Sequence, residues 1–155
     1  MFNKNLIILF FSQIFSFTAA PITVFLSGII GSTMTEIKSL STLPVALMIV
    51  GTSLGSIFAA FLMSIIGRKL GFICGTLIAS IAGLLGAFSI INNNLIFFCF
   101  ANFLIGIGAA FSSQYRFAAA ESVSDKYIPK SISIILLASM VGALLGPNIA
   151  SLTKN

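Results

Sequence analysis

The chain has 155 residues, of which 58% are hydrophobic and only 7% are charged. A soluble domain carries roughly 25% charged residues, so this composition excludes an ordinary soluble protein and indicates an integral membrane protein. The formal net charge is +5, but the basic residues are not gathered into a nucleic-acid-binding surface, so no nucleic-acid partner is expected. Histidine is absent and only two cysteines occur, which excludes the usual zinc sites; no metal and no cofactor are expected.

Five apolar segments follow one another along the chain, each with the length of about 20 residues or more that is needed to cross a ~30 Å hydrocarbon core. They cover approximately residues 6–30, 43–66, 71–91, 95–117 and 131–152. The first resembles a signal peptide, but Pro21 would directly follow the cleavage point and the apolar run continues to Ile30, which favours a retained helix. The sequence therefore predicts an all-α integral membrane protein with five transmembrane helices.

A short basic turn, Gly67-Arg68-Lys69, separates the second and third segments. Arginine and lysine are costly in hydrocarbon, so this turn is expected at a membrane surface. Glycine at Gly67 and Gly71 lets the backbone turn sharply between two helices. Positive charge further indicates that this surface is the cytoplasmic one.

The basic residues indicate the orientation of the chain, because cytoplasmic loops carry an excess of lysine and arginine. With the N-terminus inside, six of the eight basic residues lie on the inner side and two on the outer side; the inner ones are Lys4, Arg68, Lys69, Arg116, Lys126 and Lys130, and the outer ones are Lys38 and Lys154. We therefore expect a cytoplasmic N-terminus, an external C-terminus of this chain, and a location in a bacterial inner membrane.

Polar side chains within the apolar segments need either a partner or a wet cavity. On the fourth segment Asn102, Gly106, Ala109, Ser113 and Arg116 fall within about 40° of one line at 100° per residue. On the first segment Gln13, Ser16, Ala20 and Ser27 form a similar stripe. Interhelical hydrogen bonding is favoured for the serines, whereas for Gln13 and Asn102 both bonding and cavity lining stay open. The candidate cavity residues are Gln13, Asn102, Ser113 and Arg116.

The third segment has few polar side chains, among them Thr76 and Ser80. Their hydroxyls can bond to carbonyls one turn back in the same helix. This segment is therefore expected at the periphery of the bundle, with the first and fourth segments at the cavity.

Three stretches of the chain resemble motifs of the major facilitator superfamily of transporters. The family's turn Gly-x-Leu-x-Asp-x-x-Gly-Arg-Arg/Lys corresponds to Ala60, Leu62, Ser64, Gly67, Arg68 and Lys69. Its fourth-helix pattern Arg-x-x-x-Gly-x-Gly-x-Ala corresponds to Asn102, Gly106, Gly108 and Ala110. Its antiporter-type fifth-helix pattern, which begins Gly-x-x-x-Gly-Pro, corresponds to Gly142, Gly146 and Pro147. The three matches occur in the order that the family has.

The resemblance implies two six-helix bundles with the solute site between them near mid-membrane. The five expected helices correspond to most of one such bundle, so residues 1–155 are read as a partial N-terminal bundle, and a C-terminal transporter half is implied as the missing partner. The implied gating residues are Gly67, Arg68, Lys69, Glu121, Gly142, Gly146 and Pro147.

The departures from the family motifs bear on the mechanism. Ser64 stands where the family has an acidic residue, so Arg68 is expected to pair with Glu121 or Asp125 instead. Asn102 replaces the arginine associated with proton coupling in antiporters, and none of the five segments holds an acidic residue, so a proton-binding carboxylate would have to lie elsewhere. Pro147 cannot donate to the carbonyl of Ala143, which predicts a kink in the fifth segment.

Two functions from different classes follow from these observations. The favoured one is the N-terminal part of a secondary active transporter that moves a small organic solute by alternating access, with export as one direction considered. The alternative is a structural or accessory membrane subunit that packs against a partner membrane protein and moves nothing. An enzyme is not expected, because the apolar segments hold no His, Asp or Glu that could act as a base for their serines.

Overall fold

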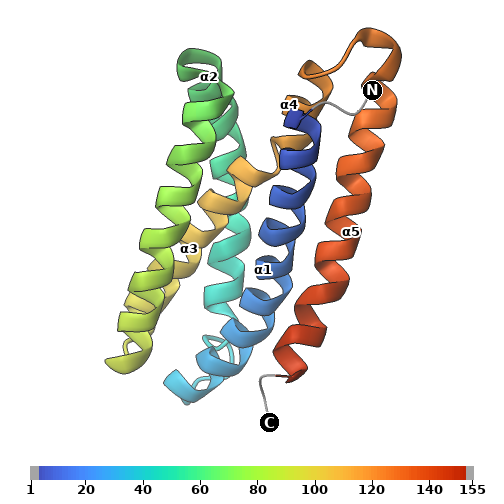
Figure 1. Cartoon of the computed structure of the whole chain (residues 1–155). Helices are drawn as coiled ribbons and strands as arrows, with labels where there is room; N and C mark the ends of the chain where they lie inside the picture. Colours follow the sequence, from blue (N-terminus) through green and yellow to red (C-terminus); the bar gives the residue numbers. More distant parts are fainter. Residues whose placement is uncertain (1–3, 153–155) are drawn as a thin grey trace. The chain divides into compact units, whose positions relative to one another are not determined.

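The computed structural model describes residues 4–152, which form helices and connecting turns without any strand. The elements are α1 (Lys4–Met34), α2 (Leu43–Ile91), α3 (Leu95–Ser112), α4 (Tyr115–Glu121), the single 3-10 turn η1 (Asp125–Tyr127) and α5 (Ile128–Leu152) (Figure 1). They divide into two compact units, residues 4–23 with 113–152, and residues 24–112. Each unit is described by itself below.

Four helical stretches in this part of the chain are long and apolar enough to cross a membrane, so the expected count of five separate helices is wrong. The second and third apolar segments form one helix, α2, of 49 residues. A straight helix of that length would extend about 74 Å, more than twice the ~30 Å hydrocarbon core. A straight α2 would therefore not fit a bilayer.

The helix α2 folds back on itself at Gly67, as Figure 1 shows. Gly67 has φ 82° and ψ 164°, a backbone conformation that is essentially restricted to glycine. A Cβ added to Gly71 would meet the side chain of Met63, although residues eight apart in a straight helix lie about 12 Å from each other. The basic turn therefore lies where the sequence predicts it, but one glycine reverses the chain and helical structure resumes at once on either side. We call residues 43–66 the first arm of α2 and residues 68–91 the second arm.

Small residues bring α3 close to both arms of α2. On the first arm, a Cβ added to Gly55 would lie 2.9 Å from Cα of Ile107. On the second arm, a Cβ added to Gly108 of α3 would lie 2.9 Å from Cβ of Ala79. Packing of this kind drives helix association in lipid, where exclusion of water contributes nothing between helices. Gly51, Gly55 and Ala59 recur every four residues along the first arm, and this stripe of small residues marks the face on which it meets α3.

Larger side chains fill the space between the glycine contacts. Ala59, Met63 and Phe111 form a buried cluster, against which Phe72 and Ile107 pack. The ring of Phe111 also meets that of Phe58 edge to face, with 6.3 Å between the centroids. Both arms of α2 and α3 contribute to this cluster, which makes residues 24–112 a unit with its own core.

Local hydrogen bonds satisfy polar side chains in this unit, and those of Thr76 and Ser80 confirm an expectation from the sequence. Thr76 donates to the carbonyl of Phe72 and Ser80 to that of Thr76, both at 2.9 Å, so these exposed hydroxyls are satisfied within their own helix. The uncharged turn after α2 is also tight: Asn93 adopts φ 48°, and Oδ1 of Asn94 accepts from the first amides of α3. Asparagine tolerates the left-handed conformation and is a favoured N-cap, which explains this turn.

The fourth apolar segment does not form one regular helix over residues 95–117. The helix α3 ends at Ser112, a turn follows at Ser113 and Gln114, and α4 begins at Tyr115. The new helix starts with bonds from the amides of Phe117 and Ala118 to the carbonyl of Gln114. The stretch Leu95–Glu121 still counts as one of the four that could cross a membrane, but a turn interrupts its regular helix after Ser112. The projection at 100° per residue therefore holds only up to that turn.

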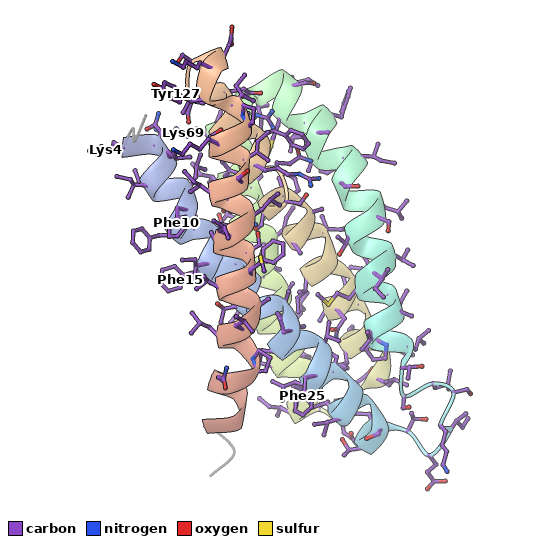
Figure 2. The ribbon with its side chains drawn as sticks, turned by 90° about the vertical axis from the view of Figure 1, so that its right-hand side faces the viewer. Lys4, Phe10, Phe15, Phe25, Lys69 and Tyr127 are labelled. Atoms are coloured by element: carbon purple, nitrogen blue, oxygen red, sulfur yellow. The ribbon has the colours of Figure 1, made fainter. Side chains whose placement is uncertain are left out.

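In the other unit, α5 packs closely on the first part of α1. A Cβ added to Gly142 would lie 2.6 Å from the carbonyl oxygen of Ile14, and one added to Gly146 would lie 2.8 Å from that of Thr18. Only glycine leaves room for this approach. The outer sides of the helices carry large apolar side chains instead; Phe15, which is 75% exposed, stands out from α1 in Figure 2. Such side chains suit contact with lipid.

Candidate functional site

Asn102 lies on α3 and is 1% exposed. Its Oδ1 accepts a hydrogen bond of 2.6 Å from the hydroxyl of Ser27 on α1, and its Nδ2 donates to the carbonyl of Phe98 at 2.9 Å. Of the two roles left open by the sequence, interhelical hydrogen bonding is therefore present for this amide. Its contact with a solute stays a prediction.

Gln13 lies on α1 and is 4% exposed. Its Nε2 donates to Oγ of Ser139 on α5 at 2.7 Å, so this amide too forms an interhelical bond. Its Oε1 is buried and has no hydrogen-bond partner among the described residues. A buried carbonyl oxygen without a partner is unfavourable by about 1–3 kcal/mol, and such an atom in a native structure needs an explanation.

Ser139 was not among the residues that the sequence singled out. It lies three residues before Gly142 and seven before Gly146, on the face of α5 that packs against α1. That spacing was the available signal: a polar residue in register with closely packed glycines faces the same neighbour as the glycines do.

Ser113 and Arg116 lie beyond the end of α3, so the regular helical projection from Asn102 does not extend to them, and a shared face with Asn102 stays a prediction. Ser113 is in the turn and Arg116 is in the first turn of α4. The guanidinium of Arg116 lies 4.9 Å from the centre of the Phe117 ring, a cation–π contact, and the residue is exposed. Whether either residue contacts a solute stays a prediction.

The candidate gating residues belong to both units. Arg68 is half-buried, with Nη1 3.8 Å from Sδ of Met63, and Lys69 is exposed. Glu121 is the exposed last residue of α4. The expected pairing of Arg68 with Glu121 or Asp125 would join the two units and stays a prediction. Ser64, at the acidic position of the family motif, returns its hydroxyl to the carbonyl of Phe61 at 2.7 Å.

Gly142, Gly146 and Pro147 lie together on α5, and the first two make its close contacts with α1. A Cβ added to Gly146 would also meet the ring of Pro21 at 3.4 Å, so a proline of α1 lies at the same contact. The helix α5 continues through Pro147 to Leu152. The expected kink and gating role stay predictions.

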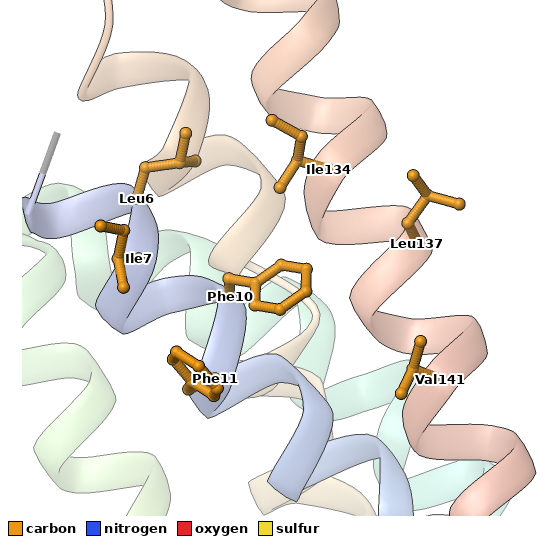
Figure 3. Close-up of a pocket in the computed structure, with 7 residues that line it drawn as sticks. All are labelled: Leu6, Ile7, Phe10, Phe11, Ile134, Leu137 and Val141. Atoms are coloured by element: carbon orange, nitrogen blue, oxygen red, sulfur yellow. The ribbon is translucent and has the colours of Figure 1, made fainter. Parts of the chain in front are cut away.

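A groove of about 510 Å³ lies along α1 and α5 (Figure 3). It is lined by hydrocarbon side chains alone, from Leu6, Ile7, Phe10, Phe11, Ile134, Leu137 and Val141. Such a groove can hold an acyl chain or another apolar group, but it offers nothing that would orient a polar solute. Within residues 4–152 no group of three or more His, Cys, Asp or Glu side chains could hold a metal ion.

Long apolar helices that meet at small-residue faces, with amides buried between them, define a polytopic helical membrane protein. The comparison with known families identifies the class further. The chain belongs to the Major Facilitator Superfamily, whose family model matches residues 6–153. It is therefore a transporter-family protein and not an enzyme.

Curated relatives support this assignment. The chain is 30% identical over 153 residues to a protein named Riboflavin transporter RfnT from Brucella anthropi, an alignment that covers 99% of this chain and 38% of that protein. It is 26% identical to the proteins named Uncharacterized MFS-type transporter YddS and YdeG from Bacillus subtilis, in each case over 97% of this chain and 35% of the relative. The chain thus spans less than two fifths of the length of these relatives. No solved structure matches it significantly.

Proposed function

We propose that this chain forms part of the N-terminal bundle of a secondary active transporter that moves a small organic solute by alternating access. The observation that carries the proposal is the family match over residues 6–153, together with the order of the three motifs along the chain. The fold of this family holds its solute between two bundles, so the activity would need helices beyond those described.

The proposed topology places the N-terminus in the cytoplasm of a bacterial cell and lets both arms of α2 cross the membrane. Each arm has about the 20 residues that a crossing needs, and the turn between them carries Arg68 and Lys69. Positive charge at that turn favours the cytoplasmic side. The same turn would close against Glu121 or Asp125 when the cytoplasmic gate closes.

A neutral solute with hydrogen-bonding groups fits these helices best. The polar side chains buried in the described helices are amides and hydroxyls, among them Gln13, Ser27 and Asn102, and the apolar segments hold no acidic residue. Amides can bind hydroxyl, amide and imide groups without pairing a charge. Riboflavin, the solute in the name of one relative, is of this kind and is the first compound to test.

The close contact of α5 with α1 is the proposed moving part. Gly142 and Gly146 present no side chain at the contact, so one helix can slide on the other with little steric barrier. Pro147 removes one helical hydrogen bond next to this contact and makes bending there easier. We propose that bending at Pro147 accompanies the change between inward-open and outward-open states.

The test is uptake of radiolabelled riboflavin by a riboflavin-auxotrophic bacterium without its own importer, after expression of the complete gene that encodes this chain. Uptake above the empty-vector level supports import, and riboflavin release from loaded cells supports export. If a protein that is inserted in the membrane moves neither riboflavin nor other neutral solutes in either direction, the accessory-subunit hypothesis replaces the transporter.

A further inference from the structure

The amide of Gln13 is held in one orientation by Ser139. The hydroxyl of Ser139 donates to the carbonyl of Ile135 at 3.1 Å, one turn back in α5. Its single proton is therefore used in that hydrogen bond, and toward Gln13 the hydroxyl oxygen of Ser139 can act only as an acceptor. Gln13 must therefore present its NH₂ group, and Nε2 lies 2.7 Å from Ser139 Oγ. The amide oxygen then points elsewhere.

The amide oxygen of Gln13, Oε1, is a hydrogen-bond acceptor that has no donor in the described part of the chain. Gln13 is 4% exposed, and Oε1 is buried without a hydrogen-bond partner. Turning the amide round would not remove the problem, because Ser139 would have to give up its bond to Ile135 and Nε2 would lose its acceptor. The position therefore calls for a donor from outside the side chains seen here, either a water molecule or a group of the solute.

We infer that Ser139 is a positioning residue that keeps Gln13 Oε1 free, and that this oxygen accepts a hydrogen bond from an N–H or O–H group of the transported solute. The inference rests on the proposed function and adds a substrate class to it: solutes that can donate a hydrogen bond. The oxygen is covered in the structure, so the solute meets it in another state of the alternating-access cycle, one that uncovers Oε1 while the bond between Gln13 and Ser139 is kept.

The first experiment compares riboflavin with two analogues in the complete protein. 3-Methylriboflavin lacks the imide N–H and lumiflavin lacks the ribityl hydroxyls, so each removes one set of donors. We expect a KM roughly 5- to 10-fold higher for one analogue than for riboflavin, the effect of about one hydrogen bond. The Gln13→Met variant cannot accept that bond, so in this variant the KM of the analogue divided by the KM of riboflavin should fall to nearly 1. If this KM ratio is the same in the wild-type protein and in Gln13→Met for both analogues, the inference is overturned.

Variants of Ser139 test its positioning role. Ser139→Ala should raise the KM for riboflavin several-fold with kcat little changed, and Ser139→Thr should restore it because the hydroxyl is kept. Ser133→Ala is the matched control, because Ser133 also donates to a carbonyl one turn back on α5, that of Pro129, but is exposed. If Ser139→Thr behaves like Ser139→Ala, or if Ser133→Ala raises KM equally, the positioning role is wrong.

Infrared spectroscopy separates a solute from a trapped water without relying on transport. The complete protein is labelled with ¹³C-glutamine, and the difference from its Gln13→Met variant identifies the C=O band of Gln13. Without solute the C=O band should lie at the frequency of a free carbonyl, and saturating riboflavin should lower it. A band that is already at the hydrogen-bonded frequency, and that riboflavin does not move, overturns the inference in favour of water.

Two further results also decide the inference: the effect of Ser16→Ala on the C=O band, and the band of a protein that does not transport riboflavin. A shift of the band in Ser16→Ala would show that this hydroxyl, one turn along α1, is the donor, and would overturn the inference. If the wild-type protein does not transport riboflavin, the proposed solute fails, and the band without solute decides the inference: a free carbonyl supports it and a hydrogen-bonded one overturns it.

Discussion

The hydroxyl of Ser27 donates a hydrogen bond of 2.6 Å to Oδ1 of Asn102, which ties α1 to α3. Both side chains are at most 2% exposed. The hydroxyl and the amide would each be unsatisfied if the other were removed, and neither could turn to water. The pair is therefore a specific polar link between α1 and α3.

A double-mutant cycle on this pair should give a coupling free energy of about 0.6 kcal/mol, and at most about 1.7 kcal/mol, the range found for hydrogen bonds between membrane helices. The variants are Ser27→Ala, Asn102→Leu and their combination, measured by unfolding in mixed micelles. Ser53→Ala is the control, because this exposed hydroxyl is satisfied by the carbonyl of Ile49 and should change stability little. Additive effects of the two substitutions would contradict the assigned bond.

Transport should fall in Gln13→Leu and in Asn102→Leu while membrane insertion stays normal. The reason is the proposed contact of these buried amides with the solute, which leucine cannot make. Uptake per inserted protein is the measurement, with Thr76→Val as the control, because Thr76 is exposed on the second arm of α2 and bonds within its own helix. Normal transport by both leucine variants would remove these amides from the solute path.

Gly106→Ala should destabilise the contact of α3 with α2 by about 1–3 kcal/mol, because a Cβ there would collide with the carbonyl of Met48. Gly83→Ala is a matched substitution in the second arm of α2, where no atom lies within 4 Å of the added Cβ. It should be neutral or stabilise the helix by up to about 1 kcal/mol. Thermal unfolding in detergent measures both, and equal effects would contradict the close packing.

Gly67→Ala should destabilise the fold through backbone strain alone. The residue has φ 82° and ψ 164°, a conformation that costs a residue with a side chain about 1–3 kcal/mol, and an added Cβ would meet no atom within 4 Å. Gly28→Ala is the control, since Gly28 lies within α1 and its added Cβ is also free of contacts. If both variants unfold alike, the reversal at Gly67 does not require glycine.

Reporter fusions should place Asn93 and Asn155 outside the cell and Lys69 inside. The expectation follows from the excess of basic residues on one side, including the two in the turn at Gly67. Lys154 and Asn155 lie outside the described residues, so the fusion after Asn155 tests the orientation by itself. A cytoplasmic signal after Asn93 would mean that the second arm of α2 does not cross the membrane as proposed.

The features of this protein that could be predicted from its sequence depend on interactions between residues close together in the chain. The apolar runs require helices because lipid cannot satisfy backbone groups, and Gly67 reverses the chain because only glycine adopts its conformation at little cost. The back-bonding of Thr76 and Ser80 depends on atoms one turn away. The count of separate helices was wrong for an equally local reason: one residue suffices for the reversal, so helical structure resumes directly and no loop divides α2.

Only the tertiary structure decided the partners of the buried amides. Asn102 bonds to a residue 75 positions away, and Gln13 to one 126 positions away. Which side chains meet over such separations depends on the faces with which helices pack, and many small-residue stripes in this sequence offer such faces. The sequence could therefore show that Gln13 needs a partner, but not that Ser139 would satisfy its nitrogen and leave its oxygen free, because that outcome is set by where α5 lies against α1.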